Sequence, residues 1–152
     1  MNATTDPVQL FAARAGSYSR FIRLVRYQQG LRAYFKVSPS LRSGIRVLDA
    51  GCGTGAVLLA LHEAMVARGF LLGPLHGFDL TPGMLDRLRA SLRTRRIEGV
   101  ELVQADVLKL DALAAAWHNY DLIVSASMLE YVPRAQFSAA LRCASRCPSP
   151  AP

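Results

Sequence analysis

Residues 47–55 read VLDAGCGTG: two apolar residues, an aspartate, an alanine, and then glycine at every second position. The apolar stretch 45–48 predicts a short buried strand, and residues 56–68 predict a helix because their apolar side chains recur on one face. Glycine allows a sharp turn and a close approach of the backbone to a ligand. The segment therefore predicts a strand, a ligand-binding turn, and a helix whose free N–H groups face the ligand.

The alternation of strand and helix continues along the chain. Further strands are predicted at 75–80, 100–104 and 120–125. Helices are predicted from Thr81-Pro82 (an N-cap and an N1 proline), from Asp111 to Trp117 and from Arg134 to Arg142. A helical pattern at 7–35, interrupted at Gly16-Ser17 and at Gly30, precedes them.

This order predicts an α/β fold, with a doubly wound, mostly parallel, Rossmann-like sheet of about four strands and an N-terminal helical segment. We divide the chain into a helical segment at 1–40, a ligand-binding domain at 41–142 and a disordered tail at 143–152. Ligands of such sheets bind beyond the carboxyl ends of the strands. Asp49, Asp79, Asp106 and Ser125 stand at or just beyond these predicted ends.

The glycines alone fit two classes of ligand. Gly51 and Gly53, followed by Ala56, also satisfy the dinucleotide-binding fingerprint. A P-loop is excluded because no Gly-Lys-Ser/Thr ends the turn. Asp49 places negative charge where a pyrophosphate would be repelled, and it suits a ligand that carries an ammonium and a sulfonium group.

With Asp49 included, VLDAGCGTG resembles motif I of the class I S-adenosylmethionine-dependent methyltransferases. Residues 120–133, YDLIVSASMLEYVP, resemble motif IV of the branch that methylates small molecules. The resemblance runs from about Ile45 to Leu141 and implies an enzyme with S-adenosyl-L-methionine as cofactor and a small-molecule acceptor.

The resemblance also implies a set of cofactor-binding residues. Asp79 would grip both ribose hydroxyls, Asp106 the adenine amino group, and the Val107 N–H a ring nitrogen. The full set is Asp49, Gly51, Cys52, Gly53, Asp79, Leu80, Met84, Asp106, Val107 and Ser125, with Met128 near the methionine part. Tyr131 stands where many relatives have a histidine that in some of them faces the substrate. No residue is marked as a general base, and His62, His76 and His118 are predicted to be structural or solvated.

The family's complete domain has more strands than this sequence predicts, and residues 143–152 carry no strand pattern. The tail resembles the product of a truncated or frame-shifted reading frame, and we expect retained cofactor contacts with weak or no turnover. Two alternatives stay open: a fragment of an NAD-binding oxidoreductase, which must explain Asp49 and Asp106, and a non-catalytic cofactor-binding or regulatory module.

Composition limits the remaining possibilities. The chain has no apolar run long enough to span a membrane, no signal-peptide pattern, and three cysteines without a Cys-x-x-Cys pair, so we expect a cytoplasmic protein without a metal site. Its net charge is +7, and eight Arg and Lys residues lie between 14 and 46 with no acid among them. That segment predicts either a phosphate-bearing partner or a solvated helix face. Nucleic-acid bases are disfavoured because the Asp/Asn-Pro-Pro-Tyr signature is absent.

Overall fold

A parallel four-stranded sheet forms the centre of the molecule, with strand order β3-β2-β1-β4. The strands are β1 (Val47–Ala50), β2 (Leu75–Asp79), β3 (Val100–Gln104) and β4 (Leu122–Val124). A computed structural model describes residues 27–112, 117, 119–126 and 128–145. Val47 is paired with both Leu75 and Leu122, and Leu75 is paired with Val100, so the four strands start at one level.

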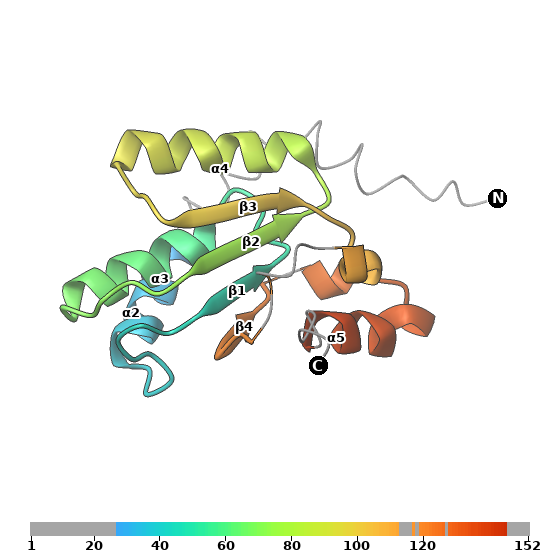
Figure 1. The fold of residues 1–152 in the computed structure, drawn as a ribbon, viewed down its shortest axis with the longest axis horizontal. Helices are drawn as coiled ribbons and strands as arrows, with labels where there is room; N and C mark the ends of the chain where they lie inside the picture. Colours follow the sequence, from blue (N-terminus) through green and yellow to red (C-terminus); the bar gives the residue numbers. More distant parts are fainter. Residues whose placement is uncertain (1–26, 113–116, 118, 127, 146–152) are drawn as a thin grey trace.

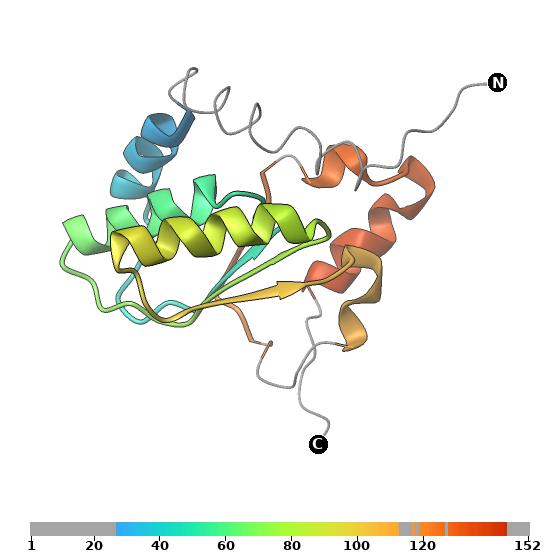
Figure 2. The same cartoon turned by 90° about the horizontal axis from the view of Figure 1, so that it is seen from above.

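The helices form two groups (Figures 1 and 2). The first group lies along one face of the sheet and contains α2 (Tyr27–Val37), α3 (Ala56–Ala67) and α4 (Pro82–Arg95). The second group contains three short 3-10 helices, η1 (Val107–Ala112), η2 (Met128–Tyr131) and η3 (Arg134–Gln136), and then α5 (Phe137–Ser145). The strands point towards η1, η2 and α5, which therefore lie at the carboxyl end of the sheet.

Two apolar cores cover the sheet. Val47 and Leu75 face a core shared with α2, α3 and α4, in which Phe35 of α2 is buried. Leu48, Ala50 and Phe78 face a second core with η1, Trp117 and α5. β1 is buried along its whole length, as expected for a parallel strand covered on both faces. The predicted α/β architecture is confirmed.

Several boundaries differ from the predictions. α2 passes through Gly30, because a single glycine costs only about 1 kcal/mol in a helix and the packing of Leu31 and Phe35 on the core outweighs it. β1 begins at Val47 rather than at Ile45. The 3-10 helix η1, at Val107–Ala112, was not predicted, and residues 113–116 of the helix expected from Asp111 to Trp117 lie outside the described residues. α5 continues past residue 142 to Ser145. Residues 7–26, 113–116 and 146–152 lie outside the described residues.

The predicted start of α4 is confirmed, with Thr81 as N-cap and proline in the first turn. Within the described part of the chain, no helix combines the length and the apolar character needed to cross a membrane.

Candidate functional site

The turn after β1 requires glycine at two positions. Gly51 and Gly55 have φ of 76° and 88°, in the left-handed region that other residues rarely adopt. A Cβ on Gly51 would lie well under 3.0 Å from the Met128 side chain, and one on Gly55 equally close to Leu88. The backbone N–H groups of Gly51 and Cys52 both donate to the Phe78 carbonyl at 2.9 Å. The turn is thus held against the end of β2 and directly against η2.

A cavity of about 250 Å³ opens at the carboxyl ends of the strands. It lies between the glycine turn, the ends of β2 and β3, the start of η1, and the segment around η2. Its lining residues are Gly51, Gly53, Phe78, Asp79, Leu80, Thr81, Met84, Ala105, Asp106, Val107, Leu108, Ala126, Met128, Tyr131, Val132 and Pro133. Most of them are apolar, and the ionisable ones are Asp79, Asp106 and Tyr131.

Asp79 joins the two main parts of this pocket. One carboxylate oxygen accepts the Gly53 N–H at 2.9 Å, and the other accepts the Thr81 N–H at 2.8 Å. A carboxylate oxygen has about two lone-pair sites, so each oxygen retains capacity for one further donor. The contact with Thr81 resembles a helix cap, but the contact with Gly53 also fixes the carboxylate across the glycine turn, beside the cavity.

Asp49 lies beside the pocket in a different environment. Its side chain is 1% exposed, and neither carboxylate oxygen has a hydrogen-bond partner among the described residues. Burial raises the pKa of Asp49 to about 7, and the Asp79 carboxylate adds to this rise. The backbone N–H of Leu58, in the first turn of α3, makes no full hydrogen bond to Asp49 but lies close enough to oppose the rise in pKa. A buried carboxyl group without a partner is costly, and this one stands at a turn shaped for close approach.

Asp106 and Val107 form the far wall of the pocket. One oxygen of Asp106 accepts the Leu108 N–H at 3.0 Å, which fixes the carboxylate at the start of η1. Val107 is buried and packs in the second core. Two carboxylates, Asp79 and Asp106, therefore line the cavity at the ends of neighbouring strands.

Comparison of the chain with known proteins identifies its family. A family model described as a methyltransferase domain matches residues 47–151. The chain belongs to this methyltransferase family. Its similarity to an aklanonic acid methyltransferase from Streptomyces sp. (strain C5) is 29% identity over 93 residues, covering 61% of this chain and 39% of that relative.

Solved structures agree with this methyltransferase fold. An S-adenosylmethionine-dependent methyltransferase from Mesorhizobium loti has 29% identity and a TM-score of 0.55, with 80% of this chain and 48% of that chain covered. The magnesium protoporphyrin IX methyltransferase from Synechocystis PCC 6803, solved with bound S-adenosylmethionine, has 19% identity and a TM-score of 0.66 over 95% of this chain and 73% of that chain. The chain thus spans well under half the length of the curated relative.

The methyltransferase domain brings most of the predicted site residues to one cavity. Those that line it are Gly51, Gly53, Asp79, Leu80, Met84, Asp106 and Val107, together with Met128 and Tyr131. Asp49, Cys52 and Ser125 do not line it. Cys52 is buried beneath the turn, where a Cβ on Gly77 would lie 3.1 Å from its sulfur. Ser125 is exposed just after β4.

Several residues that line the cavity were not predicted from the sequence. Phe78, Thr81, Ala105 and Leu108 are direct chain neighbours of predicted residues, so their place at the strand ends was a usable signal. Ala126, Val132 and Pro133 come from the segment around η2, whose return across the glycine turn has no signature in the sequence.

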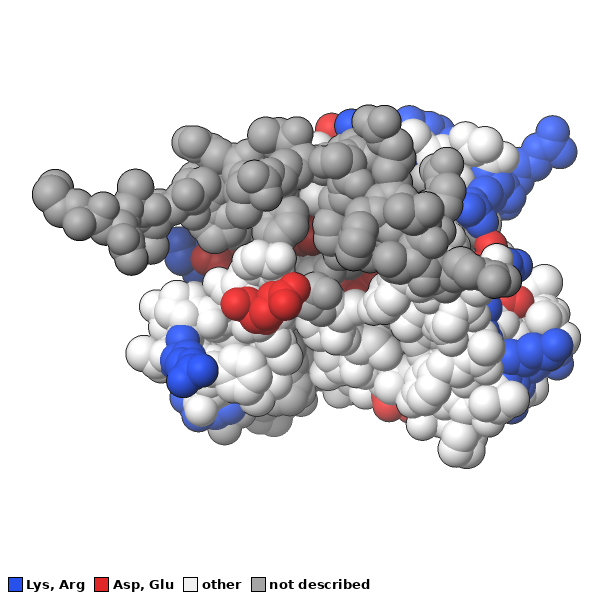
Figure 3. All heavy atoms as spheres, turned by 180° about the vertical axis from the view of Figure 1, so that it is seen from behind, with Lys and Arg blue, Asp and Glu red and all other residues white. Residues whose placement is uncertain are grey.

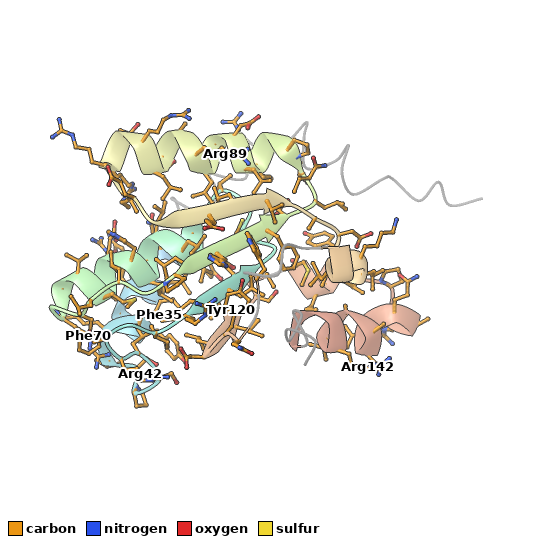
Figure 4. All side chains as sticks on the ribbon, viewed as in Figure 1. Phe35, Arg42, Phe70, Arg89, Tyr120 and Arg142 are labelled. Carbon is orange, nitrogen blue, oxygen red and sulfur yellow. The ribbon has the colours of Figure 1, made fainter. Side chains whose placement is uncertain are left out.

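At the opposite end of the sheet, polar groups satisfy one another. His76 is buried, its Nδ1 lies 2.6 Å from the Tyr120 hydroxyl, and its ring stacks on Trp117. Tyr120 is labelled in Figure 4. Burial lowers the pKa of His76. Asp121 accepts the Arg46 N–H at 2.9 Å and pairs with Arg42. The contacts give His76 a structural place, as predicted; His118 lies outside the described residues.

Basic side chains gather at that same end, on the right in Figure 3, where α4 finishes. Within the basic segment predicted from the sequence, Arg32 pairs with Glu63 of α3, and Arg42 pairs with Asp121. Glu63 also accepts Arg95 of α4 at 2.6 Å. These pairs connect neighbouring elements and lie away from the pocket.

Proposed function

We propose that this chain is the cofactor-binding part of an S-adenosylmethionine-dependent methyltransferase that acts on a small molecule. The observation that carries the proposal is Asp79, which is fixed by the Gly53 and Thr81 N–H groups and lines the pocket beside the glycine turn. The family match and the S-adenosylmethionine-dependent relatives support the cofactor.

The residues present fit this cofactor by their chemistry. A vicinal diol offers two donors, and Asp79 retains one acceptor site on each oxygen. Asp106 and the Val107 backbone would hold the adenine, with Leu80 and Met84 beside it. Asp49 is buried without a hydrogen-bond partner among the described residues, but, like Cys52 and Ser125, it does not line the cavity, so the roles of these three residues stay predictions.

When bound, S-adenosylmethionine supplies an electrophilic methyl group. The chain's part is to bind, to orient and to exclude water, which is sufficient for a displacement whose leaving group departs neutral. Asp79 and Asp106 are committed to backbone N–H groups and are poor candidates for proton transfer. Tyr131, at the mouth of the pocket and 45% exposed, is placed to contact an acceptor.

An NAD-binding oxidoreductase is less favourable. It shares the fold and Asp79, but a pyrophosphate at the glycine turn would lie near Asp49, whose carboxylate repels it when ionised, and Asp106 has no place in that alternative. The relatives reported above are methyltransferases and do not favour this alternative.

The acceptor is proposed by class only. The Streptomyces relative is named for aklanonic acid, which supports a small organic acceptor. Four statements stay predictions: that nucleic acid is not a substrate, that the protein is cytoplasmic, that the chain divides at residues 40 and 142, and that the chain alone has weak turnover.

Calorimetric titration of the 152-residue chain with S-adenosylhomocysteine and with NAD tests the proposal. We expect binding of S-adenosylhomocysteine and none of NAD, with Asp79→Ala weakening the binding of S-adenosylhomocysteine by about 100-fold. Binding of NAD alone would contradict the proposal. Steady methyl transfer by the purified chain would contradict only the prediction of weak turnover.

A further inference from the structure

Exposed apolar side chains gather at the amino end of the sheet, away from the pocket. They come from the last turns of α2 and α3 and from the loop at 69–74, and we call them the amino-end patch: Val37, Val66, Leu71 and Leu72. Val37 is 78% exposed and Leu71 is 75% exposed. Single apolar residues on a surface are ordinary, but a group of them on adjoining segments indicates an interaction site.

The segments that carry the amino-end patch are fixed against one another. The Arg68 guanidinium donates to the Ser38 carbonyl at 2.8 Å, just past the end of α2, and lies 4.4 Å from the centre of the Phe70 ring. The Leu71 N–H donates to a side-chain hydroxyl, and its carbonyl accepts an N–H, both from residues 43–44, at 3.0 and 2.9 Å. The loop marked by Phe70 in Figure 4 therefore has a fixed backbone, while the Leu71 side chain stays exposed.

Basic side chains border the amino-end patch. The loop at 69–74 and the turn at 96–99 lead into the paired residues Leu75 and Val100, so α4 ends beside the patch. The ends of α2 and α4 supply three exposed basic residues, which we call the basic rim: Lys36, Arg93 and Arg96. None of the three forms a salt bridge within the described part of the chain. Lys and Arg side chains at this end are visible on the right of Figure 3.

The acidic groups at the amino end offset only part of this charge. Glu63 and Asp121 are already paired with arginines of neighbouring elements. Glu98 and Glu101, before and within β3, are exposed. The chain as a whole has a net charge of +7. Both the basic rim and the net charge therefore favour an anionic partner.

We propose that the amino-end patch docks on an anionic lipid surface, with its aliphatic side chains at the boundary between headgroups and acyl chains and with the basic rim on the lipid phosphates. Apolar side chains flanked by Lys and Arg bind such surfaces through both parts. Each part is weak by itself, so the docking is reversible. The pocket lies at the carboxyl end of the sheet and stays open to solvent when the amino end is docked.

Two other partners fit this surface less well. A nucleic acid is held mainly through its phosphates, which the basic rim can contact but exposed leucine and valine side chains cannot satisfy. A second copy of the chain would bring one basic rim against another, because a two-fold interface uses the same surface of both copies. An anionic lipid surface uses the apolar and the basic side chains together. The inference does not depend on the cofactor.

Co-sedimentation of the full 152-residue chain with lipid vesicles tests the inference. One set of vesicles contains phosphatidylcholine alone, and the other contains phosphatidylcholine and phosphatidylglycerol in equal parts. We expect binding to the anionic vesicles to be tighter by about ten-fold or more. It should weaken as the salt concentration rises, because salt screens exposed charges. Equal binding to the two sets, or binding to neither, overturns the proposal.

Paired variants assign the binding to the amino end. Leu71→Ser combined with Leu72→Ser should weaken binding to the anionic vesicles by about ten-fold. The matched control is Phe137→Ser combined with Leu141→Ser, which removes two exposed apolar side chains of α5 at the other end of the sheet. It should bind as the wild type does. Circular dichroism verifies that each variant is folded.

The basic rim is tested separately. Lys36→Gln, Arg93→Gln and Arg96→Gln combined should weaken binding to the anionic vesicles by about 100-fold, or about five-fold for each residue. Arg134→Gln, on η3 at the carboxyl end, removes one exposed charge and should have no effect. Unchanged binding after loss of the basic rim overturns the proposal, and this test stands even if the leucine pair does not fold.

The other partners predict different results. Tighter binding of a DNA duplex than of the anionic vesicles, lost with the basic rim but kept in the leucine variant, overturns the proposal in favour of nucleic acid. A dimer in analytical ultracentrifugation that dissociates in the leucine variant overturns it in favour of a second copy. Vesicle binding that the α5 control weakens as much as the leucine variant does also overturns it.

Discussion

The two ends of the sheet treat polar groups in opposite ways. At the amino end, where the strands begin, His76 is bonded to Tyr120, and Asp121 is bonded to Arg42 and to the Arg46 backbone. At the carboxyl end, Asp79 keeps unused acceptor sites and Asp49 has no hydrogen-bond partner within the described residues. At the amino end the polar groups bond to one another and stabilise the fold, whereas at the carboxyl end they keep the capacity to bind a ligand.

The largest effect should come from adding a methyl group to a glycine. Gly51 and Gly44 share a φ of 76°, but a Cβ meets Met128 at Gly51 and meets nothing within 4 Å at Gly44. Both alanine variants incur backbone strain of about 1–2 kcal/mol. Gly51→Ala also incurs overpacking of about 1–3 kcal/mol and should lose ligand binding. Urea unfolding measures the difference; equal destabilisation of the two variants would contradict the packing of η2 on the turn.

The next effect concerns pH. Because burial raises the pKa of Asp49 from 3.8 to about 7, the folded protein holds a proton there that the unfolded chain releases. The free energy of unfolding therefore falls as pH rises from about 4 to about 7 and stays low above that range. Asp49→Asn lacks this loss, so its free energy of unfolding should rise by about 4 kcal/mol relative to that of the wild type between pH 4 and pH 8. Urea unfolding at both values measures it, and a difference that does not vary with pH would refute it.

A matched pair of carboxylates compares the two ends directly. Asp79→Ala leaves two backbone N–H groups without an acceptor, and Asp121→Ala leaves one together with the Arg42 guanidinium, so each should destabilise the fold by about 1–2 kcal/mol. Only Asp79→Ala should weaken binding of S-adenosylhomocysteine, by about 100-fold, or about 2.7 kcal/mol. Calorimetry measures the affinity. An equal loss of binding in Asp121→Ala would contradict the claim that only the carboxyl end of the sheet binds the ligand.

The smallest effect belongs to the amino end. Tyr120→Phe removes the hydroxyl that lies 2.6 Å from His76 Nδ1 and should cost about 1 kcal/mol of stability. Ligand affinity should not change, because neither residue lines the cavity. Thermal unfolding with and without S-adenosylhomocysteine measures both quantities. A weaker ligand-induced shift than in the wild type would show that the two ends are coupled.

The sequence predicts the strands, and it predicts Asp49, Asp79 and Asp106 at or just beyond their ends. Both predictions depend only on the local hydrophobic pattern and on the order of the segments along the chain. The burial of Asp49 could not, since it depends on where α3 and the neighbouring strands pack. The contact of Met128 with Gly51 joins residues far apart in the chain and has no local signature. The helix break predicted at Gly30 is absent, because packing of α2 on the core outweighs the small free-energy cost of a glycine within a helix.

The common starting level of the four strands constrains how this domain can vary. Val47 stands level with Leu75 and Leu122, and Leu75 with Val100, so strand length alone sets where each acidic side chain emerges. One residue inserted within β2 would move Asp79 by about 3.3 Å and turn it to the other face. Insertions in the loop at 69–74, before β2 begins, leave that alignment unchanged. Length variation among descendants of this sequence should therefore accumulate in the loops at the amino end and spare the strands themselves.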